Sequence, residues 1–209
     1  MTNVLLIIFT ISLLYLSIAH RLVTYIKILA FQGVLLFGIA FIELIEINAI
    51  NLTFVLFETI AVKAIVIPLF MNYTMKRNRI TRDADPFVPN FVSLIIITLI
   101  IIATFALSNS ITDTRISKIY FVVALSTLFA GLYIIVTRSK IITHIIGYLV
   151  IENGVFILSV ALGNEMPVLV NLGILLDIFA SIFLLGVFAN RIGDVLKDVD
   201  VDQLKNLKD

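Results

Sequence analysis

The sequence predicts an all-α polytopic membrane protein with seven transmembrane helices, and three observations lead to this class. Only 14% of the 209 residues are charged while 61% are hydrophobic, and the mean hydropathy is +1.14. A soluble domain carries about 25% charged residues, so most of the surface of this chain is expected to face lipid. In addition, seven apolar stretches are long enough to cross a bilayer, and the Lys and Arg residues fall mainly in alternate loops.

Each of the seven stretches approaches the roughly 20 apolar residues that a helix needs to cross the hydrocarbon core. The first stretch lacks the basic start of a signal peptide and is interpreted as a membrane span. Short polar links separate the second span from the third and the sixth from the seventh, which predicts two antiparallel hairpins. The predicted spans cover residues 2–19, 28–47, 52–71, 90–108, 118–137, 144–163 and 167–189.

The distribution of Lys and Arg predicts an outside N-terminus and an inside C-terminus, because cytoplasmic loops carry an excess of cations. With this orientation the inside segments hold twelve of the fifteen cations, and the outside segments hold Arg115 and Lys118. The fifteenth cation, Lys63, lies within the third span. For the inside tail after Arg191 a solvated segment is favoured over a short amphipathic helix.

A shift of the chain by 114 residues superposes the two hairpins and indicates a tandem repeat of three-helix units. It aligns Gly33 with Gly147 and Lys63 with Asp177. The shift spans four helices, so both units have the same orientation, unlike the inverted repeats of many transporters. The predicted domains are a first three-helix unit (1–72), a cytoplasmic loop with connecting helix (73–117), a second three-helix unit (118–190) and a cytoplasmic tail (191–209).

Five ionisable residues fall well within the predicted spans, away from their ends, namely Glu43, Glu58, Lys63, Glu152 and Asp177. A charge at mid-bilayer costs roughly 2.5–3.5 kcal/mol even on gentle insertion scales, so such residues face protein or water and are functional candidates. Glu152 and Asp177 both lie ~15–18 Å below the tip of the second hairpin at 1.5 Å of rise per residue. Two carboxyl groups that face each other at one depth repel, which favours a proton held by one of them. Lys63 is the expected counter-charge.

Two interpretations of these charges stay open, because Glu152, Lys63 and Asp177 can handle protons or ions, or can form a static ion pair that locks helices together. Weaker candidates for the same polar set are Glu46, His144, Asn153 and Asn171. The chain has no cysteine, which excludes disulfides, thiolate metal sites and iron–sulfur clusters of its own. It also lacks a phosphate-binding glycine loop, an H-E-x-x-H motif and a nucleophile elbow. We therefore predict neither a catalytic residue nor a cofactor or metal site in this chain, and no nucleic-acid partner.

The segments GYLVIENGVF and MPVLVNLGILLDIF, followed by a final hydrophobic run, carry a resemblance to a known family. The chain resembles the hydrogenase-4 component E family, which are membrane subunits of formate-hydrogenlyase-like group 4 NiFe hydrogenases. Its last three spans are also similar to the K or 4L subunit of complex I and to the C subunit of multisubunit Na⁺/H⁺ antiporters. This resemblance implies a proton path, with Glu152 as the acid of the second helix and Asp177 as the acid of the third. Where the family often has another acid before LGILLD, this chain has Asn171, which cannot titrate and leaves more of the task to Asp177.

The resemblance further implies a non-catalytic membrane-arm subunit of a group 4 NiFe hydrogenase or complex I-like oxidoreductase. Such a subunit contributes to proton translocation and to assembly in the cell (inner) membrane of a bacterium or archaeon. Its expected partners are antiporter-like and membrane-anchor subunits, and the NiFe and Fe–S centres are expected in partner subunits. The alternative is a subunit of a multisubunit cation/proton antiporter, or of a related ion-transport complex without a redox module. A purely structural anchor has no need of acids at mid-membrane.

Overall fold

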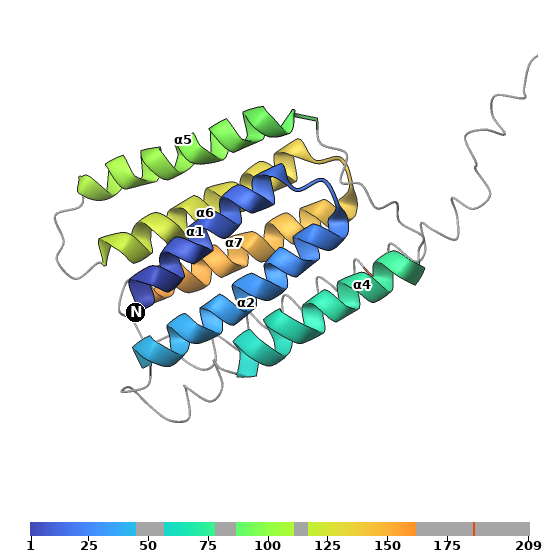
Figure 1. Cartoon of the computed structure of the whole chain (residues 1–209), viewed down its shortest axis with the longest axis horizontal. Coiled ribbons are helices and arrows are strands. Elements are labelled where there is room, and N and C mark those ends of the chain that lie inside the picture. Colours follow the sequence, from blue (N-terminus) through green and yellow to red (C-terminus); the bar gives the residue numbers. More distant parts are fainter. Residues whose placement is uncertain (45–56, 78–86, 111–116, 162–185, 187–209) are drawn as a thin grey trace, which may run out of the picture.

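The computed structural model describes residues 1–44, 57–77, 87–110, 117–161 and 186, and this part of the chain is helical, without a β-strand (Figure 1). The predicted all-α class is therefore confirmed for the described residues. In chain order the elements are α1 (Thr2–Ile18), α2 (Leu22–Leu44), the π-helix η1 (Glu58–Val66), α4 (Ile67–Arg77), α5 (Asn90–Asn109), α6 (Lys118–Thr137) and α7 (Ile141–Ala161).

Three of these helices are long and apolar enough to cross a membrane, which identifies the chain as a membrane protein by helix length and composition. Among the described residues they are Leu22–Ile42 of α2, Asn90–Asn109 and Lys118–Thr137. Two shorter apolar segments, Thr2–Ile18 and Ile142–Leu158, accompany them. Seven spans and the orientation of the chain stay predictions. The predicted seventh span lies outside the described residues except for Gly186.

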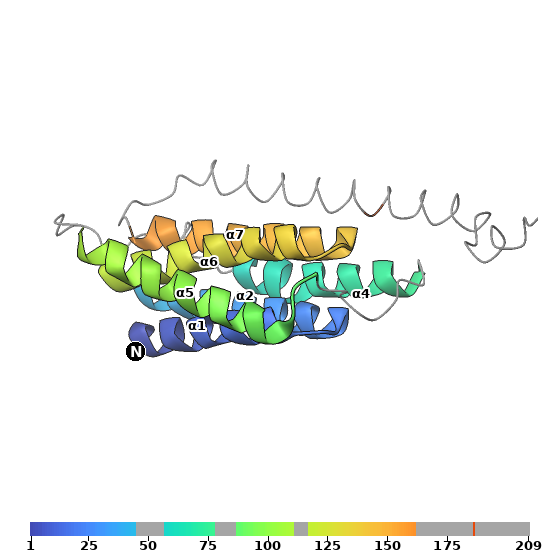
Figure 2. The ribbon, with the colours of Figure 1, turned by 90° about the horizontal axis from the view of Figure 1, so that it is seen from above.

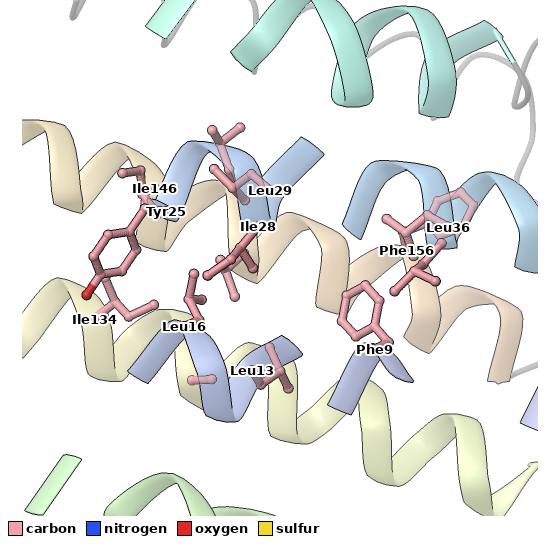
Figure 3. Close-up of a cluster of buried hydrophobic side chains, with 14 of the residues drawn as sticks. Phe9, Leu13, Leu16, Tyr25, Ile28, Leu29, Leu36, Ile134, Ile146 and Phe156 are labelled. Carbon is pink, nitrogen blue, oxygen red and sulfur yellow. The ribbon is translucent and has the colours of Figure 1, made fainter. Parts of the chain in front are cut away.

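The helices lie side by side in a bundle (Figures 1 and 2). In Figure 1, α5 and α4 lie at its two edges, and in Figure 2, α1 and α7 lie on opposite faces. The helix α1 packs against α2, α5 and α6, whereas α2 also contacts α7, η1 and α4. Figure 3 shows the core between these helices, where Phe9 of α1 lies near Leu36 of α2 and Phe156 of α7, and Leu16 of α1 lies near Ile28 of α2. Large apolar side chains such as Phe105 on α5 are exposed, as expected where lipid is the solvent.

Three hydrogen bonds gather the ends of α1, α5 and α6 at one end of the bundle. They run from Asn90 Nδ2 to Ile18 O (2.9 Å), from Phe87 N to Thr137 O (3.0 Å) and from Arg138 Nη2 to Ser17 O (3.0 Å). The C-terminal ends of α1 and α6 therefore meet the N-terminal end of α5. The sequence had assigned these ends, with their cations Arg21, Arg138 and Lys140, to one side of the membrane.

Glycines allow α6 and α7 to pack with their backbones close together. A Cβ added to Gly131 of α6 would lie 2.6 Å from the carbonyl oxygen of Gly147 on α7. A Cβ on Gly147 would in turn lie 2.8 Å from the carbonyl oxygen of Gly131. Small residues at such contacts let helices pack closely in lipid, where the hydrophobic effect does not drive helices together.

Some helix boundaries differ from those expected, and one predicted span contains an element that was not expected. The helix α2 begins at Leu22 rather than at 28, so Lys27 lies on a helix with its side chain exposed instead of in a loop. A long lysine side chain can reach the membrane surface from within a helix. In the third predicted span, residues 58–66 form a π-helix, a rare element that is frequently found at functional sites. No sequence signal had indicated it.

Candidate functional site

A buried ion pair joins η1 to α7. The ammonium nitrogen of Lys63 contacts Oε1 of Glu152, and the two side chains are only 5% and 8% exposed. The second carboxylate oxygen, Oε2, is buried and has no hydrogen-bond partner among the described residues. Such an ion pair is costly to bury unless its remaining atoms are also satisfied, so packing stability alone gives little reason for it.

This ion pair lies near the middle of the bundle along the helix direction. Glu152 is the twelfth of the 21 residues of α7, which places it ~16 Å from the start of a helix ~30 Å long. Lys63 lies within η1, which packs against α2 next to α7. The ion pair therefore lies far from both ends of α7, and in a helix that crosses a membrane a charge near the middle is the most costly.

Phe156 provides a second contact for the same ammonium group. The ring lies one helical turn after Glu152 on α7, and Lys63 Nζ is 5.1 Å from its centroid. Residues four apart share one face of a helix, so α7 presents a carboxylate and an aromatic ring to one cation. A cation over an aromatic ring gains about 2 kcal/mol when it is desolvated.

Asn153, the next residue of α7, begins a chain of hydrogen bonds that leads away from the ion pair. Its Nδ2 donates to Oε1 of Gln32 on α2 (3.1 Å), and Nε2 of Gln32 donates to Oγ of Ser12 on α1 (2.9 Å). The Ser12 hydroxyl donates to the backbone carbonyl of Phe9 (2.6 Å). All three polar side chains are buried. This amide chain, Asn153–Gln32–Ser12, links α7, α2 and α1.

Gly33 explains how η1 comes close enough for the ion pair. A Cβ at this position of α2 would lie 2.9 Å from the backbone nitrogen of Ala64 and 3.1 Å from the carbonyl carbon of Lys63. A larger residue would separate the two helices. The absence of a side chain at Gly33 thus permits the backbone contact that brings Lys63 beside α2.

The structure brings together Lys63, Glu152 and Asn153 from the candidates chosen by sequence. His144 is half-buried and lies eight residues before Glu152 on α7, ~12 Å away along the helix axis. Glu43 and Glu58 fall on α2 and η1, but their side chains lie outside the described part. The predicted candidates Glu46, Asn171 and Asp177 lie outside the described residues altogether.

Gln32 and Ser12 are the site residues that sequence reasoning missed. The sequence-based candidates were the ionisable residues and two asparagines near them, and neither Gln32 nor Ser12 was among them. Gln32 carries a usable signal, because an amide inside the predicted span 28–47 also needs hydrogen-bond partners, although its burial costs less than that of a charge. Ser12 carries none, since a serine hydroxyl is often satisfied by a carbonyl of its own helix. Among the described residues, no cluster of three His, Cys, Asp or Glu could hold a metal ion.

The site and the helices around it define a multi-helical membrane protein with an ion pair buried at mid-depth. Over 187 residues the chain is 26% identical to the uncharacterized protein Rv0085 of Mycobacterium tuberculosis, covering 88% of this chain and 85% of that protein. It is also 27% identical over 149 residues to hydrogenase-4 component E of Escherichia coli K12, covering 70% and 68% of the two chains. The protein of that name from Shigella flexneri gives the same figures. No family model and no solved structure matches the chain.

Proposed function

We propose that this chain is a membrane-arm subunit of a group 4 NiFe hydrogenase or complex I-like oxidoreductase, and that it takes part in proton translocation. The observation that carries the proposal is the Lys63–Glu152 ion pair, buried between η1 and α7, which both pack against α2. A membrane anchor gains little from such a pair, because apolar residues of similar volume pack as well without the desolvation cost. Similarity to hydrogenase-4 component E supports the class of complex.

The chemistry of the proposed step is the gain and loss of one proton at Glu152. When a proton binds, an O–H bond forms at the carboxylate and the attraction to the Lys63 ammonium weakens. The Phe156 ring keeps that ammonium within reach, since the cation–π contact does not depend on the charge of Glu152. When the proton leaves, the carboxylate recovers its charge and the ion pair forms again.

The remaining candidate residues would add further steps to the proposed proton path. Asp177, Glu58 and Glu43 would act as further relay groups, with Glu46, His144 and Asn171 in supporting positions. NiFe and Fe–S centres would belong to partner subunits, and the neighbours would be antiporter-like and membrane-anchor subunits. The complex would lie in the cell membrane of a bacterium or archaeon, with this chain crossing it several times.

Purification of the subunit in mild detergent with its partners tests the proposed class. We expect antiporter-like subunits to copurify, together with nickel and iron measured by elemental analysis. Antiporter-like partners without these metals would instead identify an ion-transport complex that lacks a redox module. Recovery of the chain alone from verified intact membranes would contradict both assignments.

Replacement of Glu152 by Gln tests the proposed role of the ion pair. Gln keeps the size and hydrogen-bonding capacity of the side chain but cannot ionise, so we expect the complex to assemble and to lose coupled proton movement. Proton uptake into everted membrane vesicles, read from a pH-sensitive dye, measures this loss. Hydrogen oxidation with methyl viologen as acceptor provides the control for electron transfer. Normal proton uptake in Glu152→Gln would leave a static ion pair as the interpretation.

A further inference from the structure

We propose that Gln32 is a positioning residue for the Lys63–Glu152 pair, and that the amide chain through it sets the rotation of α7 without carrying protons. This inference rests on the proposed function of the pair for its role in proton movement. Its geometric part, that Gln32 keeps Glu152 directed at Lys63, does not depend on that function. The two parts are therefore tested by different measurements.

Gln32 is placed to fix the rotation of α7 about its own axis. Its side chain is fully buried and uses both ends, since the carbonyl oxygen accepts from Asn153 while the amide nitrogen donates to Ser12. Asn153 directly follows Glu152, and successive residues of an α-helix differ in direction by about 100°. When Asn153 is held toward α2, Glu152 is directed toward η1, where Lys63 lies.

The helix α2 positions both members of the ion pair through two consecutive residues. Gln32 holds α7 by the hydrogen bond to Asn153, and Gly33 allows η1 to rest directly on the backbone of α2. The cation and the carboxylate thus belong to different helices, η1 and α7, and both of these helices are held by α2. Loss of either contact would let one member move relative to the other while the fold around them persists.

The amide chain is a scaffold and not a proton path. Asn153 and Gln32 carry neutral amides that neither gain nor lose a proton near neutral pH. The last link, the Ser12 hydroxyl, donates to the backbone carbonyl of Phe9, which does not titrate either. Every donor along the chain points from α7 toward α1, away from Glu152. A proton held at Glu152 therefore leaves by another route.

Carbodiimide labelling tests the geometric part. Dicyclohexylcarbodiimide reacts with carboxyl groups in apolar surroundings, and an ammonium group in contact with the carboxylate hinders this reaction because it favours the charged form, which does not react. In the intact solubilised complex, we expect Gln32→Met to raise the labelling rate of Glu152, followed by mass spectrometry, about three- to tenfold. This is the factor expected for loss of one interhelical hydrogen bond. Lys63→Met should raise the rate at least as much.

The matched control is Thr104→Val, which removes an equally buried hydrogen bond between two other helices. The hydroxyl oxygens of Thr104 on α5 and Ser126 on α6 lie 2.7 Å apart. The helices that pack against η1 are α2 and α4, so this hydrogen bond belongs to another part of the bundle. This variant should leave the labelling of Glu152 unchanged. If Gln32→Met labels at the rate of Thr104→Val, the positioning role is overturned, whatever the proton measurements show.

Proton uptake into everted vesicles tests the functional part. We expect Gln32→Met to slow uptake about three- to tenfold and to move its pH profile in the same direction as Lys63→Met. A merely structural weakening would lower the amplitude of uptake without moving its pH profile.

Ser12→Ala should slow proton uptake less than Gln32→Met, and Ser12→Thr, which keeps the hydroxyl, should restore it. Loss in Ser12→Ala as complete as in Glu152→Gln would overturn the scaffold assignment and identify a proton path. Normal uptake in Glu152→Gln would refute the proposed function, while the labelling result would still decide the geometry.

Discussion

At the scale of single residues, Lys63 is held by two contacts of different kinds on one face of α7. Its ammonium contacts the Glu152 carboxylate and lies over the Phe156 ring, and all three side chains are buried. The ionic contact depends on the protonation state of Glu152, whereas the contact with the ring does not. In the proposed proton step, Phe156 would therefore keep the buried cation in place while Glu152 is neutral.

Replacement of Phe156 by Leu should slow proton movement while leaving electron transfer intact. Leu fills much of the same volume but offers no ring to the ammonium, so the variant loses about 0.5–2 kcal/mol of cation attraction. That corresponds to a decrease of roughly 2- to 30-fold in proton uptake by everted vesicles. Phe156→Tyr keeps the ring and serves as the control. Equal uptake in the Leu and Tyr variants would argue that the ring only fills space.

At the scale of elements, the close contact between α2 and η1 decides where Lys63 lies. Gly33 meets the backbone of η1, which cannot move aside as the end of a flexible side chain can. The π-helical stretch 58–66 begins at Glu58 and includes Lys63. The wider turn of a π-helix changes the direction of the residues within it relative to a regular α-helix. The orientation of Lys63 is thus a property of this helix pair.

Gly33→Ala should therefore displace η1 and weaken the ion pair. The added methyl group would lie 2.9 Å from a backbone nitrogen, and overpacking of this kind costs about 1–3 kcal/mol. We expect a lower unfolding temperature of the solubilised complex and slower proton uptake. Gly38→Ala on the same helix is the matched control, since its methyl group would meet only the Cδ1 end of Leu5 at 3.2 Å. Equal effects of the two substitutions would contradict a special role for the contact at Gly33.

At the scale of the whole molecule, the described helix ends separate into two groups, and the predicted orientation places one group inside and the other outside. The ends of α1 and α6 meet the start of α5 through hydrogen bonds, and the neighbouring cations Arg21, Arg138 and Lys140 belong to this end. Arg138 is almost fully buried here, with its guanidinium group 5.9 Å from the ring centroid of Tyr25. The far end of α5 finishes at Asn109.

Cysteine labelling measures the orientation that this separation implies. The chain contains no cysteine, so each introduced thiol reports a single place. In intact cells, a thiol at Ser110 should react with a membrane-impermeant maleimide, and a thiol at His20 should react only after the cells are opened. Both thiols should react in permeabilised cells, which controls for burial. The reverse pattern would place the N-terminus inside and refute the positive-inside assignment.

The sequence by itself determined the membrane class and the charges that need an explanation. Apolar runs of span length, interrupted by Lys63 and Glu152, are visible without coordinates because each is a local property of the chain. The predicted spans 90–108 and 118–137 also agree closely with the bounds of α5 (Asn90–Asn109) and α6 (Lys118–Thr137). The predicted repeat stays open, since most of its second hairpin lies outside the described residues. Gly33 faces η1, whereas its aligned partner Gly147 faces α6.

Only the tertiary structure decided which polar groups meet. The sequence named Lys63 as the counter-charge of the acids, but its contact with Glu152 in particular, the ring of Phe156 beside them and the bridge through Gln32 depend on how each helix is rotated about its axis. Apolar run length does not encode that rotation, because a span that is hydrophobic on all sides presents no preferred face. The rotation is set instead by contacts between distant segments, such as Gly33 against η1 and Asn153 against α2, which form only when the helices pack.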